Sequence, residues 1–228
     1  MELKWSVVIE SLPLLAEGAL VTLKITVIAV TLGSIIGLFA GLMRIARNPL
    51  LKFIARVYVD FIRGTPLLVQ IFIIYYGFPQ LWAALTGGQP HAISPWAAAI
   101  ASTSINSGAY VAEIFRAGIQ SIDRGQMEAA RSLGMTYGQA MRYVILPQAF
   151  KRVIPPLGNE FIAMLKDTSL LSVIGFEELA RRGALIIGYN ARAFEVWFAV
   201  AVLYLIMTLL ISQLVSYTER RLKTGDHH

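Results

Sequence analysis

The sequence contains no cysteine and only three histidines, two of which are the terminal His227 and His228. A disulfide or a thiolate metal site is therefore impossible, and the histidines offer no metal cluster. Charge is also scarce, because charged residues make up 15% of the 228 residues and hydrophobic residues 56%. The helices of a soluble protein would need polar faces that long apolar blocks lack. We therefore predict an all-α integral membrane protein.

Sequence motifs of catalysis are missing too. Nothing matches Gly-x-x-x-x-Gly-Lys-Ser/Thr, the loop that cradles nucleotide phosphates. No Ser-His-Asp arrangement and no paired-carboxylate site indicates hydrolysis, and the first residues lack the small-residue site of a cleaved signal peptide. We expect no cofactor in this chain, and if ATP drives it, ATP and magnesium bind a separate chain.

Long apolar blocks are the main feature that is present. The block 20–43 carries only Lys24, and the block 196–218 carries no charge. A helix needs about 20 residues to cross a hydrocarbon core of ~30 Å. Each block is therefore long enough for one transmembrane helix.

Three further helices come from two other blocks. Between Arg63 and Glu113 there is no charge, and the turn-forming residues 87–91 divide this block into two spans. The stretch 153–176 is apolar except for Glu160, Lys166 and Asp167. We therefore predict five transmembrane helices.

The positions of lysine and arginine predict the orientation of these helices. Most of the 20 basic residues lie between spans one and two, between spans three and four, and after span five. They are Arg44, Arg47, Lys52, Arg56, Arg63, Arg116, Arg124, Arg131, Arg142, Lys151, Arg152, Arg220, Arg221 and Lys223. With five spans these regions share one side, which the positive-inside rule makes cytoplasmic. The N-terminus is then outside and the C-terminus inside, and the +6 charge requires no nucleic acid.

Arginine also occurs in the loop before span five, against this rule. Acidic residues of the same loop balance it in part, and we interpret the loop as an external interfacial helix. The residues concerned are Arg181, Arg182, Arg192, Glu177, Glu178 and Glu195.

A pattern of helix, break and helix occupies the second basic loop. Asp123 suits the N-cap of the first helix, with Gln126 placed to reach back to it, and Gly134 suits the left-handed residue that ends a helix. Thr136 and Gln139 then form a capping box that opens the second helix. On these local signals alone the loop is an ordinary helical linker.

The loop contains Glu-Ala-Ala followed by three residues, a glycine, nine residues, an aliphatic residue, one further residue and Leu-Pro. This pattern resembles the loop by which permease subunits of ATP-binding-cassette (ABC) importers dock on their ATPase. Val144 stands where this family usually has isoleucine, and Pro147 closes the stretch. The resemblance implies a coupling loop at 123–150, with small residues seated in a groove of the ATPase and Arg131 and Arg142 forming ion pairs at its rim. The expected contact residues are Glu128, Ala129, Ala130, Arg131, Gly134, Arg142 and Pro147.

Further motifs resemble the polar amino acid uptake permeases over residues 10–223. They are Arg63-Gly64-Thr65-Pro66, Asn106-Ser107-Gly108-Ala109-Tyr110 with Glu113, Gly158-Asn159-Glu160-Phe161-Ile162 and Lys166-Asp167-Thr168-Ser169. This resemblance implies a single type I importer permease domain at 1–223, followed by a disordered tail at 224–228, in the cytoplasmic membrane. It also implies a second permease subunit, identical or related, as well as ATPase subunits, an extracytoplasmic solute-binding protein and an amino acid substrate.

Polar residues at mid-membrane depth predict the substrate path. Asn106 lies about midway along span three, and Gln70 of span two reaches the same level. Two stripes at helical spacing follow, one of Asn106, Tyr110 and Glu113 and one of Glu160, Met164 and Asp167. The predicted substrate-binding residues are Gln70, Asn106, Tyr110, Glu160, Met164, Asp167 and Ser169.

Ionisable residues at this depth usually face a bundle interior or a wet cavity. The structural alternative is that Lys166 pairs locally with Asp167, or that Glu160 and Asn159 cap a broken helix. Because Glu160 and Asp167 outnumber Lys166, we expect cationic amino acids as substrates, with neutral ones such as glutamine as the second choice.

Two other classes of function stay open. An ion-coupled secondary transporter or channel would use Glu160 and Asp167 to bind a proton or sodium ion, but five spans do not divide into two inverted repeats. An assembly subunit without a transport path would not need the polar stripes. We therefore expect an importer subunit that is not itself an enzyme.

Overall fold

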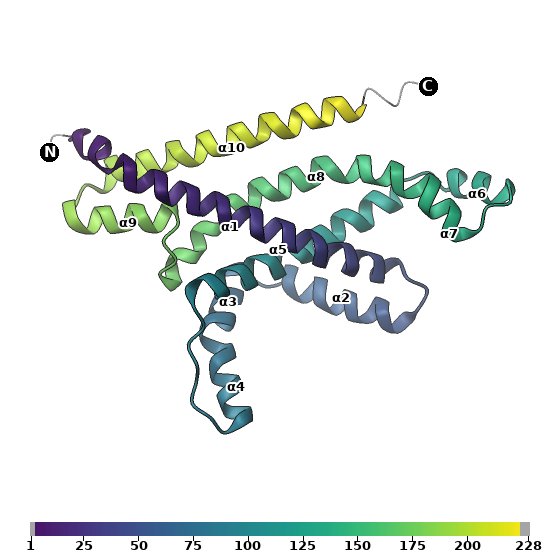
Figure 1. Cartoon of the computed structure of the whole chain (residues 1–228), viewed down its shortest axis with the longest axis horizontal. Coiled ribbons are helices and arrows are strands. Elements are labelled where there is room, and N and C mark those ends of the chain that lie inside the picture. Colours follow the sequence, from purple (N-terminus) through teal and green to yellow (C-terminus); the bar gives the residue numbers. More distant parts are fainter. Residues whose placement is uncertain (1–2, 224–228) are drawn as a thin grey trace.

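The computed structural model describes residues 3–223, which contain helices and no strand. Four long helices lie beside one another along the long axis (Figure 1). They are α1 (Ser6–Ile45), α5 (Pro95–Gln120), α8 (Leu146–Asp167) and α10 (Ala193–Lys223). The shorter helices are α2 (Pro49–Arg63), α3 (Leu67–Phe72), α4 (Phe78–Thr86), α6 (Arg124–Ser132), α7 (Tyr137–Ala140) and α9 (Leu179–Asn190). π-helical turns join α3 to α4 (Ile73–Gly77) and α7 to α8 (Met141–Ile145), and a 3-10 segment (Thr168–Ile174) follows α8.

Glycines allow α1 and α5 to approach closely. Gly33, Gly37 and Gly41 recur every four residues and so share one face of α1. A Cβ added at Gly37 would lie 2.6 Å from Cβ of Val111, and one at Gly33 would lie 2.7 Å from Cβ of Ser107. Close contact between small residues stabilises helix pairs in membranes, where lipid tails remove the hydrophobic drive. The glycine face therefore fixes the rotation of α1 against α5.

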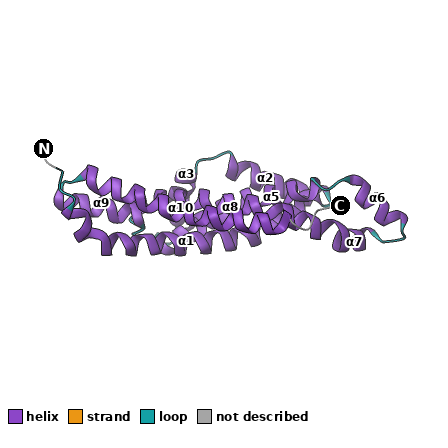
Figure 2. Cartoon of the chain, turned by 90° about the horizontal axis from the view of Figure 1, so that it is seen from above, coloured by secondary structure: helices purple, strands orange, loops and turns teal. Residues whose placement is uncertain are grey.

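The connecting elements gather at opposite ends of the body. Figures 1 and 2 show α9 and the start of α1 at one end, with α6, α7 and the α1–α2 connection toward the other. The basic loops thus lie together, as the predicted orientation requires, while the orientation itself stays a prediction. The loop before span five contains the helix α9, as expected, and its external position stays a prediction.

The predicted spans correspond to helices, with some differences in their limits. Within residues 3–223, three helical segments are long and apolar enough to cross a membrane, namely Ser6–Ile45, Leu67–Thr86 and Ala193–Arg221. The helices α5 and α8 contain 26 and 22 residues but carry more polar groups, so the count of five stays a prediction. The turn between spans two and three is confirmed, because α4 ends at Thr86 and Gly87 has φ +69°.

The basic loop has the predicted glycine break and capping box but differs from the prediction at Pro147 and Gln126. Gly134 has φ +86°, and Thr136 and Gln139 form the capping box. Pro147, expected to close the second helix, instead lies in the first turn of α8, which continues α7 through the π-helical turn. A proline within a continuous helix removes one backbone hydrogen bond, and here it directly follows the π-helical turn, where the i to i−4 ladder is already displaced. Gln126 accepts a hydrogen bond from Gln148, not the expected one from the N-cap backbone.

Candidate functional site

Two cavities adjoin the middle of the bundle. The larger, of about 720 Å³, lies between α5 and α8, and the smaller, of about 400 Å³, lies beside the break between α2 and α3. Arg63 and Tyr110 line both cavities. These volumes are within the range of small-molecule sites.

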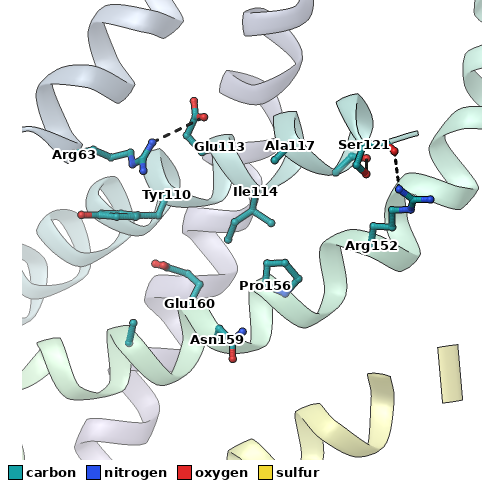
Figure 3. A pocket seen from close by; sticks show the side chains of 12 residues that line it. Arg63, Tyr110, Glu113, Ile114, Ala117, Ser121, Arg152, Pro156, Asn159 and Glu160 are labelled. Atoms are coloured by element: carbon teal, nitrogen blue, oxygen red, sulfur yellow. Dashed lines mark hydrogen bonds and ion pairs between the residues drawn. The ribbon is translucent and has the colours of Figure 1, made fainter. Parts of the chain in front are cut away.

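Glu160 is the acidic group that α8 presents to the larger cavity (Figure 3). Ser107 of α5 donates a hydrogen bond of 2.9 Å from its hydroxyl to Oε1 of Glu160. Ser107 is fully buried and packs closely against Gly33 of α1. The tight α1–α5 contact therefore positions the serine that orients the carboxylate. Ser107 is not part of the predicted stripe on α5, although it directly follows Asn106 in the sequence.

The other predicted residues of α8 do not share this cavity. Asp167 lines the smaller cavity, together with Asn106 of α5. Met164 is only 1% exposed and lines neither cavity, and Ser169 lines neither and donates its hydroxyl hydrogen to the carbonyl of Lys166. The stripe on α8 is thus divided, because α8 ends at Asp167 and Met164 turns into the protein core.

Gln70 holds the helix break together. Its Nε2 donates hydrogen bonds to the carbonyl oxygens of Ile62 (2.8 Å) and Thr65 (3.0 Å), and its Oε1 accepts one from Nδ2 of Asn106 (3.0 Å). Carbonyls released at a break in a membrane helix need such partners. Because Gln70 is 5% exposed and lines neither cavity, the structure gives it the role of fastening α2, α3 and α5.

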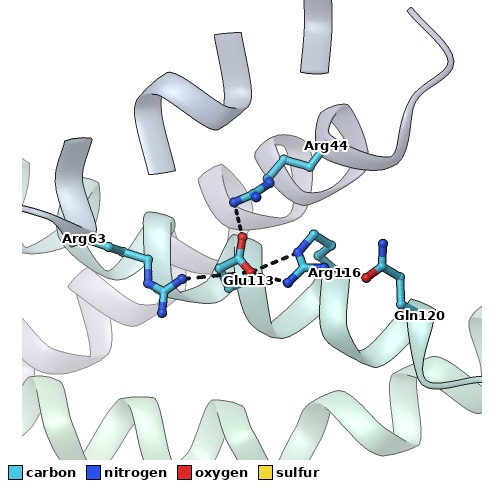
Figure 4. Close-up of polar contacts among 5 residues, drawn as sticks. All are labelled: Arg44, Arg63, Glu113, Arg116 and Gln120. Carbon is cyan, nitrogen blue, oxygen red and sulfur yellow. Dashed lines mark hydrogen bonds and ion pairs between the residues drawn. The ribbon is translucent and has the colours of Figure 1, made fainter. Parts of the chain in front are cut away.

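A carboxylate from α5 gathers three arginines near the larger cavity (Figure 4). Arg44 of α1 pairs with Oε1 of Glu113, and Arg116 approaches Oε2 with its Nη2 at 2.6 Å. Arg63 lies farther away, with Nη1 3.9 Å from the same Oε2, and its guanidinium stacks over the Tyr110 ring at 5.2 Å from the centroid. Asp60 lies one helical turn before Arg63 on α2, but the ion pair of Arg63 is with Glu113 of α5.

The proposed coupling surface is mostly accessible. Glu128, Ala129, Arg131, Gly134, Arg142 and Pro147 are exposed. Ala130, expected to contact a partner, is 4% exposed and packs against the chain itself. Arg131 donates a hydrogen bond to the carbonyl of Met135, and Arg142 lies 5.7 Å from the centroid of the Tyr143 ring.

Clusters of His, Asp or Glu that could hold a metal ion do not occur within residues 3–223. The site is therefore one of carboxylates, guanidinium groups and hydroxyls, suited to binding a charged polar solute by ion pairs and hydrogen bonds.

Comparison with known proteins gives the same picture over nearly the whole chain. The family described as "Binding-protein-dependent transport system inner membrane component" matches residues 11–224. The glutamine transport system permease protein of Escherichia coli (strain K12) is 45% identical over 223 residues, which cover 98% of this chain and 99% of that protein. The arginine transport system permease protein of Bacillus subtilis (strain 168) is 38% identical, with 99% of this chain and 100% of that protein covered.

A solved structure confirms the fold. The crystal structure of an amino acid ABC transporter with histidines has a TM-score of 0.89 and 47% sequence identity, and the match covers 97% of this chain and 100% of that one.

Proposed function

This chain belongs to the family of binding-protein-dependent transport system inner membrane components, as the permease of an amino acid ABC importer, and we propose that its preferred solutes are cationic amino acids. Its place is the inner membrane. The membership decides against an ion-coupled secondary transporter or channel.

Glu160 carries the proposal of a cationic solute. Two carboxylates line the larger cavity, Glu160 and Glu113. Glu160 accepts a hydrogen bond from Ser107 of α5, whereas Glu113 already has three arginine partners. A carboxylate facing a path of low dielectric constant attracts a cation more strongly than it would in water. One similar protein is named for arginine transport and another for glutamine transport. These names are compatible with a solute that places either a cationic or an amide side chain at Glu160.

The other subunits complete the proposed machine. ATP and magnesium bind a separate ATPase chain, which contacts the exposed residues of the loop 123–150. A second permease subunit, identical or related, pairs with this one, and an extracytoplasmic binding protein delivers the amino acid. Residues 1–223 form one permease domain of five transmembrane helices with the N-terminus outside, and the tail at 224–228 lies outside the described residues.

Competition between solutes tests the proposal. Labelled arginine uptake is measured in proteoliposomes that contain the complete importer, with unlabelled arginine or glutamine as competitor. We expect the wild type to prefer arginine and Glu160→Gln to shift the preference toward glutamine. Wild-type preference for glutamine would refute the cationic assignment, and an unchanged preference in the variant would remove Glu160 from selectivity.

Asp60→Asn provides a matched control. Asp60 is an exposed carboxylate of α2 that lines neither cavity, so its neutralisation removes the same charge without touching the site.

Uptake by the wild type and by both variants should require ATP hydrolysis. Uptake driven by a sodium or proton gradient alone would contradict the mechanism of an ATP-driven importer.

A further inference from the structure

We propose that Arg63 and Asp167 form a subsite for the zwitterionic backbone of the amino acid in the smaller cavity, separate from the site of its side chain at Glu160. Arg63 binds the α-carboxylate and Asp167 the α-ammonium group. The inference rests on the proposed function, and it identifies Arg63 as a binding residue that the sequence stripes did not include.

The surroundings of Arg63 leave its charge available to a ligand. The single carboxylate of Glu113 already contacts Arg44 and Arg116 through different oxygens. Arg63 makes the longest contact of the three, 3.9 Å, and its side chain is 43% exposed, against 18% for Arg44 and 31% for Arg116. Three guanidinium groups around one carboxylate give the cluster an excess of positive charge, and Arg63 brings that charge to both cavities.

The position of the guanidinium is well defined although it is exposed. It stacks on the Tyr110 ring, a contact that stabilises a cation and restricts its rotation. A planar guanidinium held in this way can bind a carboxylate with two parallel hydrogen bonds. Figure 3 shows Arg63 beside Tyr110, with Glu160 on the opposite side of the same ring.

The smaller cavity offers the complementary charges of an amino acid backbone. Arg63 and Asp167 both line its wall, so one cavity presents a cationic and an anionic group. Its volume of about 400 Å³ is sufficient for the backbone of a small solute. Gln70 holds Asn106 in this wall, since its Oε1 accepts the amide hydrogen of Asn106.

Arg63 and Tyr110 form the boundary between the two cavities, because both residues line both spaces. An amino acid bound at this boundary can place its backbone between Arg63 and Asp167 and extend its side chain toward Glu160. Selection for an α-amino acid and selection for its side chain are then made by different residues.

Binding of ligands that lack one group each tests this division. The probes are arginine, agmatine, which lacks the carboxylate, and 5-guanidinopentanoate, which lacks the α-ammonium group. Affinities are measured by calorimetry on the permease–ATPase complex in nanodiscs, without the binding protein. For Arg63→Gln we expect arginine affinity to fall about 10- to 100-fold, the range for hydrogen bonds to charged groups. Agmatine affinity should stay equal or rise, because agmatine has no carboxylate and the variant removes a positive charge.

Matched variants make the result specific. Asp167→Asn should weaken arginine and spare 5-guanidinopentanoate, whereas Glu160→Gln should weaken all three guanidinium ligands. Arg152→Gln removes another arginine of the larger cavity, one that donates a hydrogen bond to the Ser121 carbonyl, and should leave the ratio of arginine to agmatine affinity unchanged.

The two proposals fail in different ways. Equal weakening of arginine and agmatine in Arg63→Gln would overturn the backbone subsite and leave the importer function intact. If the wild-type complex binds neither arginine nor agmatine, or prefers glutamine to arginine, the proposed function itself is refuted. If Arg63→Gln loses its fold in a melting assay, Arg63→Lys keeps the charge without the planar fork, and an unchanged arginine-to-agmatine ratio there would equally overturn the subsite.

Discussion

Replacement of Gly134 by alanine tests the coupling loop most directly. Gly134 ends α6 with φ +86°, and the N–H groups of Gly134 and Met135 donate hydrogen bonds to the carbonyls of Arg131 and Ala130. An added Cβ would meet no atom within 4 Å, so steric collision with neighbouring residues contributes nothing. The remaining cost is that of a left-handed backbone for a residue with a Cβ, about 1–2 kcal/mol.

That free energy lowers the population of the native hairpin about 5- to 30-fold relative to opened forms. Because the hairpin lies at one end of the molecule (Figure 1), the helices that enclose the cavities should be unaffected. We therefore expect Gly134→Ala to leave arginine binding unchanged and to reduce ATPase activity stimulated by the loaded binding protein in proteoliposomes. Asparagine tolerates the left-handed region better, so Gly134→Asn should be impaired less.

Gly138 provides the control in the same loop. It lies in α7, is exposed, and has no atom within 4 Å of an added Cβ, but its φ is not positive. Gly138→Ala should be neutral or stabilise the helix by about 0.5–1 kcal/mol. If Gly134→Ala and Gly138→Ala gave the same stimulated ATPase activity, the loop would be an ordinary linker and the coupling argument would be wrong.

Three further changes test the packing of the body, each by thermal melting of the purified complex in nanodiscs. Gly37→Ala should destabilise it by about 1–3 kcal/mol, because the new Cβ collides with Val111, whereas Gly188→Ala, with open space around it, should not; equal melting would contradict the α1–α5 contact. Gln70→Leu should cost about 1–3 kcal/mol by leaving buried polar groups unpaired, and an unchanged melting temperature would show that water replaces it. Burial raises the pKa of Glu178 despite its hydrogen bonds, so the folded chain keeps a proton that the unfolded chain releases. Stability should fall as pH rises through the folded pKa, and Glu178→Gln should remove this slope; a persisting slope would assign it to another group.

Local structure followed from the sequence because its causes lie within one helical turn. The left-handed Gly134, the capping box of Thr136 and Gln139 and the turn after Thr86 each depend on neighbouring residues and on the geometry of a few backbone bonds. Long apolar blocks likewise predicted a membrane protein, since only length and hydropathy are needed to cross a bilayer. The motif resemblance predicted the family, which the comparisons confirmed.

The tertiary structure decided which polar groups meet. Ser107 and Glu160 are 53 residues apart, Arg44 and Glu113 are 69 apart, and no local pattern predicts either contact. Helical spacing places residues on one face of a helix, but the rotation of that helix against its neighbours decides whether the face meets a cavity. On α1 and α5 this rotation is fixed by the close approach at Gly33 and Gly37. Met164 and Gln70 were predicted to line the substrate path but lie buried in the protein. Packing between helices, and not the period along one helix, determines the direction of a side chain.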